Sequence, residues 1–319
     1  MPPAASTPAK PAKPAKPAKP AKAGPRHAAK PAQVIEELRP GQSIELLKEL
    51  HILTREGKLN QDTRRKLKQV YHLYNFIEPL LNDVFTATGN AALADHGAGK
   101  SYLGFIVYDL FFNVAHQGRK TQGHIYGIET RAELVEKSRA LAAHLGFARM
   151  SFLNLTVQQA TMSVELPGRI DIVTALHACD TATDDAIAFG LAKDARHMVL
   201  VPCCQAEVAS VLKRSRALNL SKTPLAELWR HPLHTREFGS QITNVLRCLQ
   251  LEANGYHVTV TELVGWEHSL KNELILASKP PAVTPATTAK TRAAQERLQA
   301  VLGELGLGEL TARFAVPLA

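Results

Sequence analysis

The chain has 319 residues, of which 45% are hydrophobic, and it carries a formal net charge of +9. This length and composition allow one large core with a small accessory domain, and they exclude a chain that is disordered throughout. Residues 1–33 contain seven Lys or Arg and no acid, so the other 31 of the 38 basic residues are balanced by all 29 acids. The excess charge therefore lies mostly in an N-terminal tail.

The tail has a regular repeat. Residues 8–22 are five consecutive Pro-Ala-Lys triplets. A period of three matches the three-residue turn of a polyproline II helix, which places the lysines on one side, roughly 9 Å apart. Such an arm can follow the phosphate backbone of RNA without recognising its sequence, and that binding should weaken steeply with salt. A solubilising linker explains the same composition, so both interpretations stay open.

No segment predicts secretion or membrane insertion. The first residues, “MPPAASTPAK”, lack the apolar core of a secretory signal. The longest nearly apolar run, “YLGFIVYDLFF”, is too short for a bilayer and is interrupted by Asp109. Four cysteines, with Cys203 and Cys204 adjacent, make a poor disulfide framework, so we expect free thiols. We expect a cytoplasmic protein, and the sequence does not indicate its oligomeric state.

Two amphipathic helices are predicted after the tail, because apolar residues recur at three- and four-residue spacing in 43–57 and 62–85. The second helix begins with four basic residues, namely Arg64, Arg65, Lys66 and Lys68. These form either a solvated helix face or a contact with an anionic substrate.

From residue 91 the pattern changes to short apolar runs that alternate with helical stretches. The strand-like runs are “AALAD”, “HIYGIE”, “RMSFLNLTV”, “IDIVTALH” and “HMVLVP”, and the helical runs lie near 100–115 and in “TRAELVEKSRALAAHLG”, “TDDAIAFGLAK” and “QAEVASVLKRSRA”. Five such units in series predict a mainly parallel sheet with helices on both faces.

The C-terminal part departs from this alternation. After a longer segment, 205–253, the strand-like runs “YHVTVTELVG” and “NELILAS” are too close for a crossover helix, so they should pair antiparallel. “PPAVTPATTAK” is a predicted linker, and “TRAAQERLQAVLGELGLGEL” a final amphipathic helix. We therefore predict an α/β chain with a seven-stranded Rossmann-like sheet. Its parts are a basic tail (1–33), N-terminal helices (34–88), the sheet domain (89–280), and a linker with a final helix (281–319).

The turn after the first strand, “ADHGAGKS”, has two interpretations. It lacks one residue of the P-loop G-x-x-x-x-G-K-[ST], because Ala94 replaces the leading glycine, and no apolar strand ends in an aspartate that would complete a magnesium site. It also contains D-x-G-x-G. In an open α/β sheet this turn is normally part of the ligand site, and Gly97 and Gly99 let the backbone approach a nucleoside closely. A tight turn without a ligand is the structural alternative.

A nucleoside that carries an ammonium group favours an acid at the end of the first strand, and Asp95 stands there. An acid that ends the second strand holds ribose hydroxyls in related dinucleotide folds, and Glu129 has this position. Strand ends are often acidic by chance, so Glu129 indicates a nucleoside site only in combination with the D-x-G-x-G turn.

The fourth strand leads into “LHACDTATDDA”, and the fifth leads into “VPCCQ”. If the two strands are neighbours, these segments converge on one pocket. His177 suits the role of proton acceptor, with Asp180 or Asp184 orienting it or acting in its place. His177 can equally be a strand terminator. Thr183 and Asp184 have a competing role as caps of the following helix, and for Asp184 we favour the cap.

The same segments contain possible zinc ligands, namely His177, Cys179, Cys203 and Cys204. Their spacing argues against zinc, because neither C-x-x-C nor H-x-x-x-H occurs. We therefore expect no metal.

Together, “DHGAGKSYL”, “LHACDTATD”, “VPCCQ” and “EHSLKNELILAS” resemble a family of class I methyltransferase domains. This family includes the glutathione-S-transferase C-terminal-domain-containing protein. “H-x-C-x-x-A-T-D” is also similar to a motif of tRNA 2′-O-methyltransferases that act on the acceptor stem. The resemblance covers roughly residues 60–280. It implies that S-adenosylmethionine binds Asp95, Gly97 and Gly99, and that 177–184 lie beside the transferred methyl group. We expect further cofactor contacts from Lys100, Glu129, Thr156 and His177.

Three departures from the family pattern stand out. Ser101 replaces a frequent glycine, Asp180 stands where glycine is common, and no acid ends the third strand to hold the adenine amino group. Backbone contacts from Thr156 or Val157 would have to serve instead.

The resulting prediction is an S-adenosylmethionine-dependent methyltransferase that acts on tRNA or rRNA. The absence of an N-P-P-[YF] motif after the fourth strand makes base amino groups less favoured acceptors, and leaves an RNA hydroxyl as the leading one. A non-catalytic RNA-binding protein on the same fold, and a protein or small-molecule methyltransferase, are the alternatives.

Overall fold

The computed structural model describes residues 37–116, 123–176, 180–202, 205–215, 222–263 and 273–315. Arg39–Ala319 form one compact unit, which contains all the helices and strands assigned among the described residues. The basic tail lies outside the described residues, as do His177, Cys179, Cys203 and Cys204.

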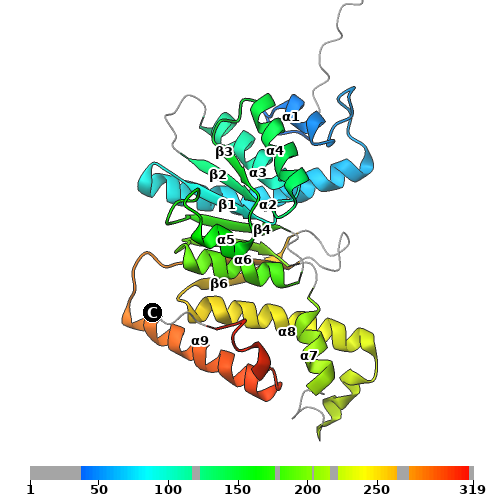
Figure 1. Ribbon diagram of the computed structural model, residues 1–319, viewed down its shortest axis with the longest axis vertical. Helices are drawn as coiled ribbons and strands as arrows, with labels where there is room; N and C mark the ends of the chain where they lie inside the picture. Colours follow the sequence, from blue (N-terminus) through cyan, green and yellow to red (C-terminus); the bar gives the residue numbers. More distant parts are fainter. Residues whose placement is uncertain are drawn as a thin grey trace, which may run out of the picture. The chain divides into compact units, whose positions relative to one another are not determined.

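Seven strands form one sheet in the order β3-β2-β1-β4-β5-β7-β6 (Figure 1). Their bounds are β1 Ala92–His96, β2 His124–Ile128, β3 Met150–Leu153, β4 Ile172–Leu176, β5 His197–Val201, β6 His257–Glu262 and β7 Glu273–Ser278. β1 to β5 pair parallel, whereas β7 pairs antiparallel with both β5 and β6. The predicted α/β class, with a Rossmann-like sheet closed by an antiparallel pair, is confirmed.

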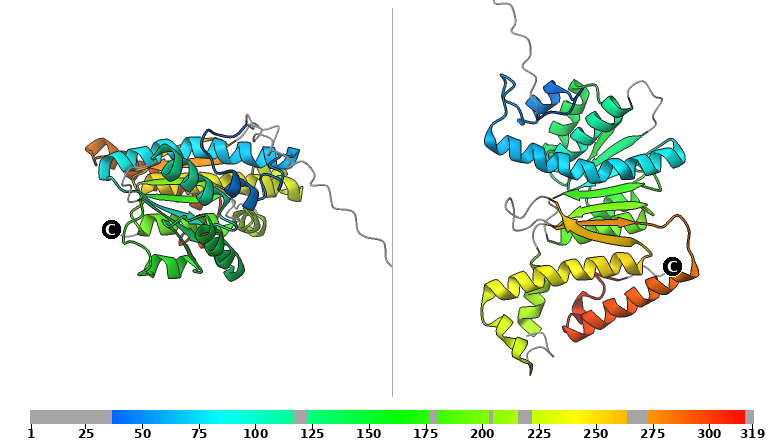
Figure 2. Two further views of the ribbon diagram at one scale, coloured as in Figure 1. Left: turned by 90° about the horizontal axis from the view of Figure 1, so that it is seen from above. Right: turned by 180° about the vertical axis from the view of Figure 1, so that it is seen from behind.

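Helices cover both faces of this sheet. Their bounds are α1 Ile44–Glu49, α2 Gln61–Thr88, α3 Tyr102–Val107, α4 Ala132–His144, α5 Val157–Met162, α6 Thr181–Ala192, α7 Glu207–Ser215, α8 Pro232–Ala253 and α9 Pro285–Glu304. A π-helix, η1 (Tyr108–Ala115), continues α3, and short 3-10 helices are η3 (Pro224–Trp229) and η4 (Gly308–Leu310). Figures 1 and 2 show α2 on one face of the sheet and α5 and α6 on the other.

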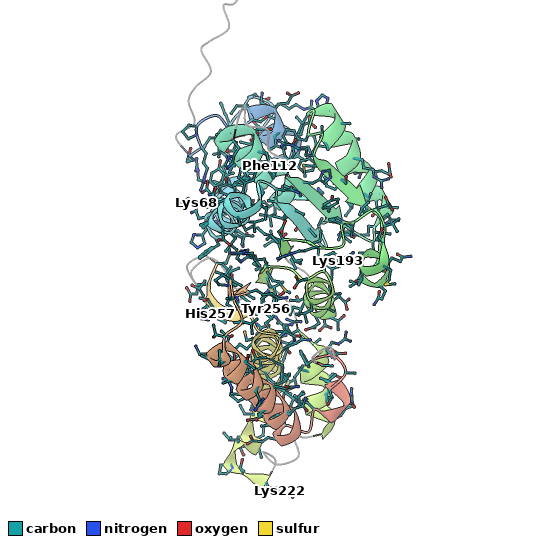
Figure 3. The ribbon with its side chains drawn as sticks, turned by 90° about the vertical axis from the view of Figure 1, so that its left-hand side faces the viewer. Lys68, Phe112, Lys193, Lys222, Tyr256 and His257 are labelled. Carbon is teal, nitrogen blue, oxygen red and sulfur yellow. The ribbon has the colours of Figure 1, made fainter. Side chains whose placement is uncertain are left out.

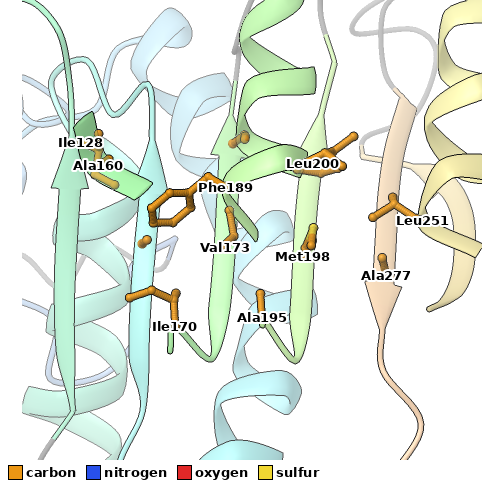
Figure 4. Close-up of a cluster of buried hydrophobic side chains, with 14 of the residues drawn as sticks. Ile128, Ala160, Ile170, Val173, Phe189, Ala195, Met198, Leu200, Leu251 and Ala277 are labelled. Atoms are coloured by element: carbon orange, nitrogen blue, oxygen red, sulfur yellow. The ribbon is translucent and has the colours of Figure 1, made fainter. Parts of the chain in front are cut away.

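One hydrophobic core lies between the sheet and α5 and α6 (Figure 4). Alternate residues of neighbouring strands point to this face. For example, Val173 on β4 pairs in register with Ala94 on β1 and with Met198 on β5. Phe189 of α6 and Ala160 of α5 pack against them. The period-two alternation of side chains along a strand puts their neighbours, Asp95 among them, on the α2 face or at the edge.

The α2 helix is fixed at both ends and to the sheet. Asn60 and Thr63 form a reciprocal capping box at its start, and Gly89 ends it with a φ of 70°. Near its end, Asp83 accepts a hydrogen bond from the side chain of His197, at 3.1 Å, and pairs with Arg196. This contact attaches the N-terminal helix to β5.

A second hydrophobic cluster joins α7, α8 and α9, with Val211, Leu246, Leu298 and Phe314 among its members. Tyr256, which lies between α8 and β6, is buried and donates a hydrogen bond to the carbonyl of Ala195 (Figure 3). Part of the C-terminal prediction was wrong, because α9 begins at Pro285, inside the predicted linker, and is capped by Thr284. The unassigned segment after α7 contains η3 and the long helix α8.

In the part of the chain that the structure describes, no helix has both the length and the apolar character needed to cross a membrane.

Candidate functional site at the carboxyl edge of the sheet

The turn after β1 is too short for a P-loop. Ala94, at the position of the leading P-loop glycine, is a fully buried strand residue, and β1 continues to His96. Only five residues, Gly97 to Ser101, connect β1 to α3. The hydroxyl of Ser101 is completely buried, so it is not positioned to bind a magnesium ion. The D-x-G-x-G interpretation of this turn is therefore the one that the backbone supports.

The turn is held open by its backbone conformation. Gly97 and Gly99 have φ values of 66° and 58°, and Ser101 adopts a φ of 50°. Glycine reaches this left-handed region at no steric cost, whereas Ser101 is strained there. Among the described residues, a Cβ at Gly97 would meet no atom within 4 Å, so the surface beside this exposed glycine is open. We call this open surface at Gly97–Gly99 the cradle.

Asp95 lies at the base of this cradle. Its side chain is only 2% exposed, and Oδ1 accepts a hydrogen bond of 2.8 Å from the Thr174 hydroxyl on β4. Burial raises the pKa of Asp95 to about 7, although the Thr174 hydrogen bond acts against this shift. A buried carboxylate that has one side-chain hydrogen-bond partner among the described residues is suited to receive a cationic group.

His96, the next residue, was missed by the sequence analysis. Its imidazole is 6% exposed, its ring centre lies 5.7 Å from that of Phe189, and burial lowers its pKa to about 4. Neither ring nitrogen has a hydrogen-bond partner among the described residues. Its position inside the D-x-G-x-G motif could have drawn attention to it.

Glu129 follows β2 and faces the same turn. Its Oε2 accepts a hydrogen bond from the Gly99 amide at 2.8 Å, and its two oxygens accept hydrogen bonds of 3.0 Å from Nε and Nη2 of Arg131. Burial alone would raise the pKa of Glu129, but the hydrogen bonds from Arg131 and Gly99 lower it to about 2. The carboxylate is therefore ionised and aimed at the turn. Sequence reasoning found Glu129 but not its partner Arg131.

Two further cofactor candidates lie in less suitable positions. Thr156 uses both its hydroxyl and its backbone amide in a capping box with Gln159 at the start of α5, so that amide is not free to contact adenine. Lys100 is exposed and lines an open cleft of about 520 Å³ together with His51, Tyr102 and Lys137. Its predicted contact with the cofactor stays a prediction.

The predicted capping role of Asp184 was wrong. Asp180 is the N-cap residue of α6, whereas Asp184 lies in the first turn of the helix, and both of its oxygens accept hydrogen bonds from the side chain of Arg247, at 2.7 and 2.8 Å. Asp180 stands immediately before α6 with φ 49° and ψ −121°, a backbone conformation that normally requires glycine. Both family departures to a non-glycine residue, Ser101 and Asp180, thus occur at positive φ.

The segments after β4 and β5 meet, because these strands are parallel neighbours. Asp180 Oδ1 accepts hydrogen bonds from the amides of Ala206 and Glu207, at 2.9 and 3.3 Å, at the start of α7. His177, the predicted proton acceptor, lies outside the described residues. The described parts of the chain contain no group of His, Cys, Asp and Glu side chains that could hold a metal ion, and all four zinc candidates lie outside those parts.

Residues 65–211 match the family model of a methyltransferase domain. The match spans a little less than half of the chain and includes the turn after β1, Glu129 and the segments that follow β4 and β5. None of the curated proteins matches the chain. S-adenosylmethionine, the predicted cofactor, agrees with this domain assignment.

Several solved structures are similar to the chain. One is a magnesium protoporphyrin IX methyltransferase from Synechocystis PCC 6803 with bound SAH, at 14% identity and a TM-score of 0.41, covering 73% of this chain and 94% of that one. Others are a putative O-methyltransferase from Klebsiella pneumoniae (13%, TM-score 0.44, 77% and 94%) and an rRNA methylase from Streptococcus thermophilus (8%, TM-score 0.35, 60% and 87%). All three similarities are distant.

Proposed function

We propose that the chain is an S-adenosylmethionine-dependent methyltransferase with an RNA acceptor. The observation that carries the proposal is the site at Asp95–Gly99. There, a buried carboxylate, an empty left-handed turn and the ionised Glu129 surround one cradle at the carboxyl edge of a domain that matches methyltransferases.

The residues of the cradle fit the cofactor chemically. Asp95 would hold the ammonium group, because a buried carboxylate gains most from a cationic partner. Glu129 would accept hydrogen bonds from the ribose hydroxyls, as the acid that ends the second strand does in related folds. The empty space beside Gly97 admits a ligand close to the backbone. Since Arg131 contacts both Glu129 oxygens, its side chain would share or leave that carboxylate when ribose binds.

The cofactor supplies an electrophilic methyl group, so the chain needs chiefly to hold an acceptor in line with it. A hydroxyl acceptor also needs a proton acceptor within hydrogen-bond reach. Asp184 is a poor candidate, because Arg247 occupies both of its oxygens. Asp180 uses Oδ1 at the start of α7. His177 therefore remains the proposed proton acceptor.

The choice of RNA rests on charge. The Pro-Ala-Lys repeat supplies a cationic arm, and Arg65, Lys66 and Lys68 are exposed at the start of α2. A positively charged arm and helix favour a polyanionic acceptor over a neutral small molecule. Removal of residues 1–33 should lower RNA affinity and reduce the slope of log affinity against log salt concentration. An unchanged slope would mean that the arm is a spacer.

Calorimetric titration with S-adenosylmethionine tests the cofactor site. We expect binding by the wild type and none by Gly97→Trp, whose side chain would fill the cradle. Gly146→Trp is the matched control, because Gly146 has a similar φ of 68° and equally open surroundings. It should bind like the wild type. Absence of binding heat in the wild type would favour a non-catalytic RNA-binding protein.

The acceptor class needs a second experiment. The protein should be incubated with methyl-labelled cofactor and, separately, with RNA, protein and small-molecule fractions. We expect label in the RNA fraction, at a ribose hydroxyl of tRNA or rRNA. Label that appears only in protein or only in small molecules would contradict the RNA assignment and leave the methyltransferase assignment in place.

A further inference from the structure

Arg247 on α8 is the centre of a buried polar cluster. Its side chain has no exposed surface, and it donates to both oxygens of Asp184, to the backbone carbonyl of Asp180 at 2.8 Å, and to Oδ1 of Asn244 at 3.1 Å. A guanidinium group directs these hydrogen bonds in a fixed plane, so it sets directions as well as charge.

The cluster reaches three separate places at the carboxyl edge of the sheet. Asn244 Oδ1 also accepts a hydrogen bond from Gln205 at 3.2 Å, and Asn244 Nδ2 donates to Glu273 Oε2 at 2.7 Å. Asp180 directly follows 177–179, Gln205 follows 203–204, and Glu273 follows 264–272. Asp180, Gln205 and Glu273 belong to the three motifs “LHACDTATD”, “VPCCQ” and “EHSLKNELILAS”. Arg247 and Asn244 thus connect one residue of each motif.

Asp180 shows that the cluster imposes a conformation. A non-glycine residue at φ 49° and ψ −121° is strained, and such a backbone persists only where its surroundings over-determine it. Here two sets of contacts do so. Arg247 holds the Asp180 carbonyl, while the amides of Ala206 and Glu207 hold its side chain.

We infer that Arg247 is a positioning residue for methyl transfer. It fixes Asp180, Gln205 and Glu273 relative to one another, and so fixes the acceptor side of the site, through Asp184 and Asn244. The inference rests on the proposed function. It assigns no direct contact with cofactor or acceptor to Arg247, and it separates the acceptor side from the cofactor cradle at Asp95, Gly97 and Glu129.

The composition of the cluster supports positioning over simple stabilisation. A buried ion pair often contributes no more to stability than hydrophobic side chains of similar volume. An arginine whose donors reach two side chains and one strained backbone carbonyl is better explained by the geometry that it enforces. Lysine would keep the charge and lose that geometry.

The test compares Arg247→Lys with Arg313→Lys. Arg313 also makes a two-pronged contact with a carboxylate, that of Glu207, at 3.0 and 2.9 Å, but it is more exposed. We expect Arg247→Lys to lower kcat for methyl transfer at least 30-fold and to leave the dissociation constant of S-adenosylmethionine within threefold. Arg313→Lys should change neither quantity by more than threefold.

A second readout does not depend on activity. Cys179, Cys203 and Cys204 precede the anchored residues in the sequence, so their rates of reaction with a thiol reagent, measured by peptide mass spectrometry, report on the anchoring. We expect at least a fivefold faster reaction in Arg247→Lys than in the wild type. If the wild type binds no S-adenosylmethionine, this measurement still tests Arg247 while the proposed function fails.

Asp180→Gly covers the case in which Arg247→Lys does not fold. Glycine accepts the positive φ, so the strain disappears while the hydrogen bonds to Ala206 and Glu207 are lost. The same fall in kcat with unchanged cofactor binding is expected. Unchanged kcat and thiol reactivity in both variants would overturn the inference. Equal loss of cofactor binding and kcat would also overturn it, because the effect would then be a general loss of structure.

Discussion

Asp95 should make cofactor binding depend on pH. Burial raises the pKa of Asp95 to about 7, so near neutral pH its carboxyl group is partly protonated when no ligand is bound. Only the ionised form of Asp95 attracts a cationic ligand group, so the apparent affinity for the ligand falls in proportion to the ionised fraction of Asp95. That fraction is about one half at pH 7 and about 3% at pH 5.5. We therefore expect roughly 15-fold weaker binding of S-adenosylmethionine at pH 5.5, or about 1.6 kcal/mol.

The neighbouring groups do not produce this dependence. Glu129 has a pKa of about 2 and His96 one of about 4, so both keep their charge state between pH 5.5 and 7. Thr174, the hydrogen-bond partner of Asp95, does not titrate in this range. The amino group of the ligand, with an ordinary pKa of about 7.7–8.0, stays mostly protonated below pH 7.

Calorimetry at pH 5.5, 6.0, 6.5 and 7.0, in two buffers of different ionisation enthalpy, measures both affinity and protons released. Wild type should release close to one proton per ligand at pH 5.5. Asp95→Asn should bind more weakly, with a flat profile and no proton release. The same slope in wild type and Asp95→Asn would assign it to another group and refute the role of Asp95.

The same pKa has a consequence for stability without ligand. A carboxyl group whose pKa is higher in the folded state than in the unfolded chain stabilises the fold when protonated, and this contribution is lost as pH rises from about 4 to about 7. Asp95→Asn should therefore unfold at a higher temperature than the wild type at pH 8, and show little difference at pH 4. Equal melting temperatures at pH 8 would contradict the burial argument.

Three further substitutions test the local geometry. Glu129→Gln should weaken S-adenosylmethionine binding about tenfold or more, because the amide loses one acceptor oxygen beside Gly99 and Arg131. The control is Glu136→Gln, at an exposed position on α4, which should bind like the wild type. Equal affinities of the two variants would remove Glu129 from the site. Ser101→Gly should raise the melting temperature by about 2–4 °C, because it relieves about 1 kcal/mol of strain at φ 50°; a lower melting temperature would show that the serine is favoured there. Gly239→Ala should lower the free energy of unfolding, measured in urea, by roughly 1–3 kcal/mol, because the new Cβ would lie 2.5 Å from Ala209 Cα. Gly303→Ala, at an open position on α9, should leave that free energy unchanged. Equal effects of the two substitutions would refute the close packing of α7 and α8.

The sheet could be predicted from the sequence because its signals are local. Buried parallel strands appear as short apolar runs, and the acids and glycines of the cofactor cradle follow those runs within a few residues. Asp95, Gly97 and Glu129 were identified in this way. Only the structure shows that β1 extends through His96, beyond the predicted strand “AALAD”, and so excludes a P-loop.

The helix α8 could not be recognised in the same way. Its apolar stripe is interrupted at buried positions by Asn244, Arg247 and Gln250, and Gly239 allows the close approach of α7. Apart from the hydrogen bond between Arg247 and Asn244, the side-chain partners of these polar residues lie more than 25 residues away in the sequence, such as Asp184 and Glu273. A search for helical periodicity assumes that the buried face of a helix is apolar. It therefore does not recognise a helix whose buried face carries a cluster of polar residues.

The two sides of the site therefore differ in how the chain specifies them. The residues of the cofactor side lie at or directly after the end of an apolar strand, so short sequence patterns mark them, and a glycine-rich turn tolerates the strained Ser101 at its end. The acceptor side depends on α8, which brings Arg247 to Asp180 across 67 residues of chain. Substitutions at the cradle should change the affinity for S-adenosylmethionine. Substitutions in the Arg247 cluster should instead change the rate of methyl transfer while S-adenosylmethionine still binds. This separation would allow acceptor choice to vary among chains with the same cradle through changes in α8 and its contacts, without rebuilding the cofactor site.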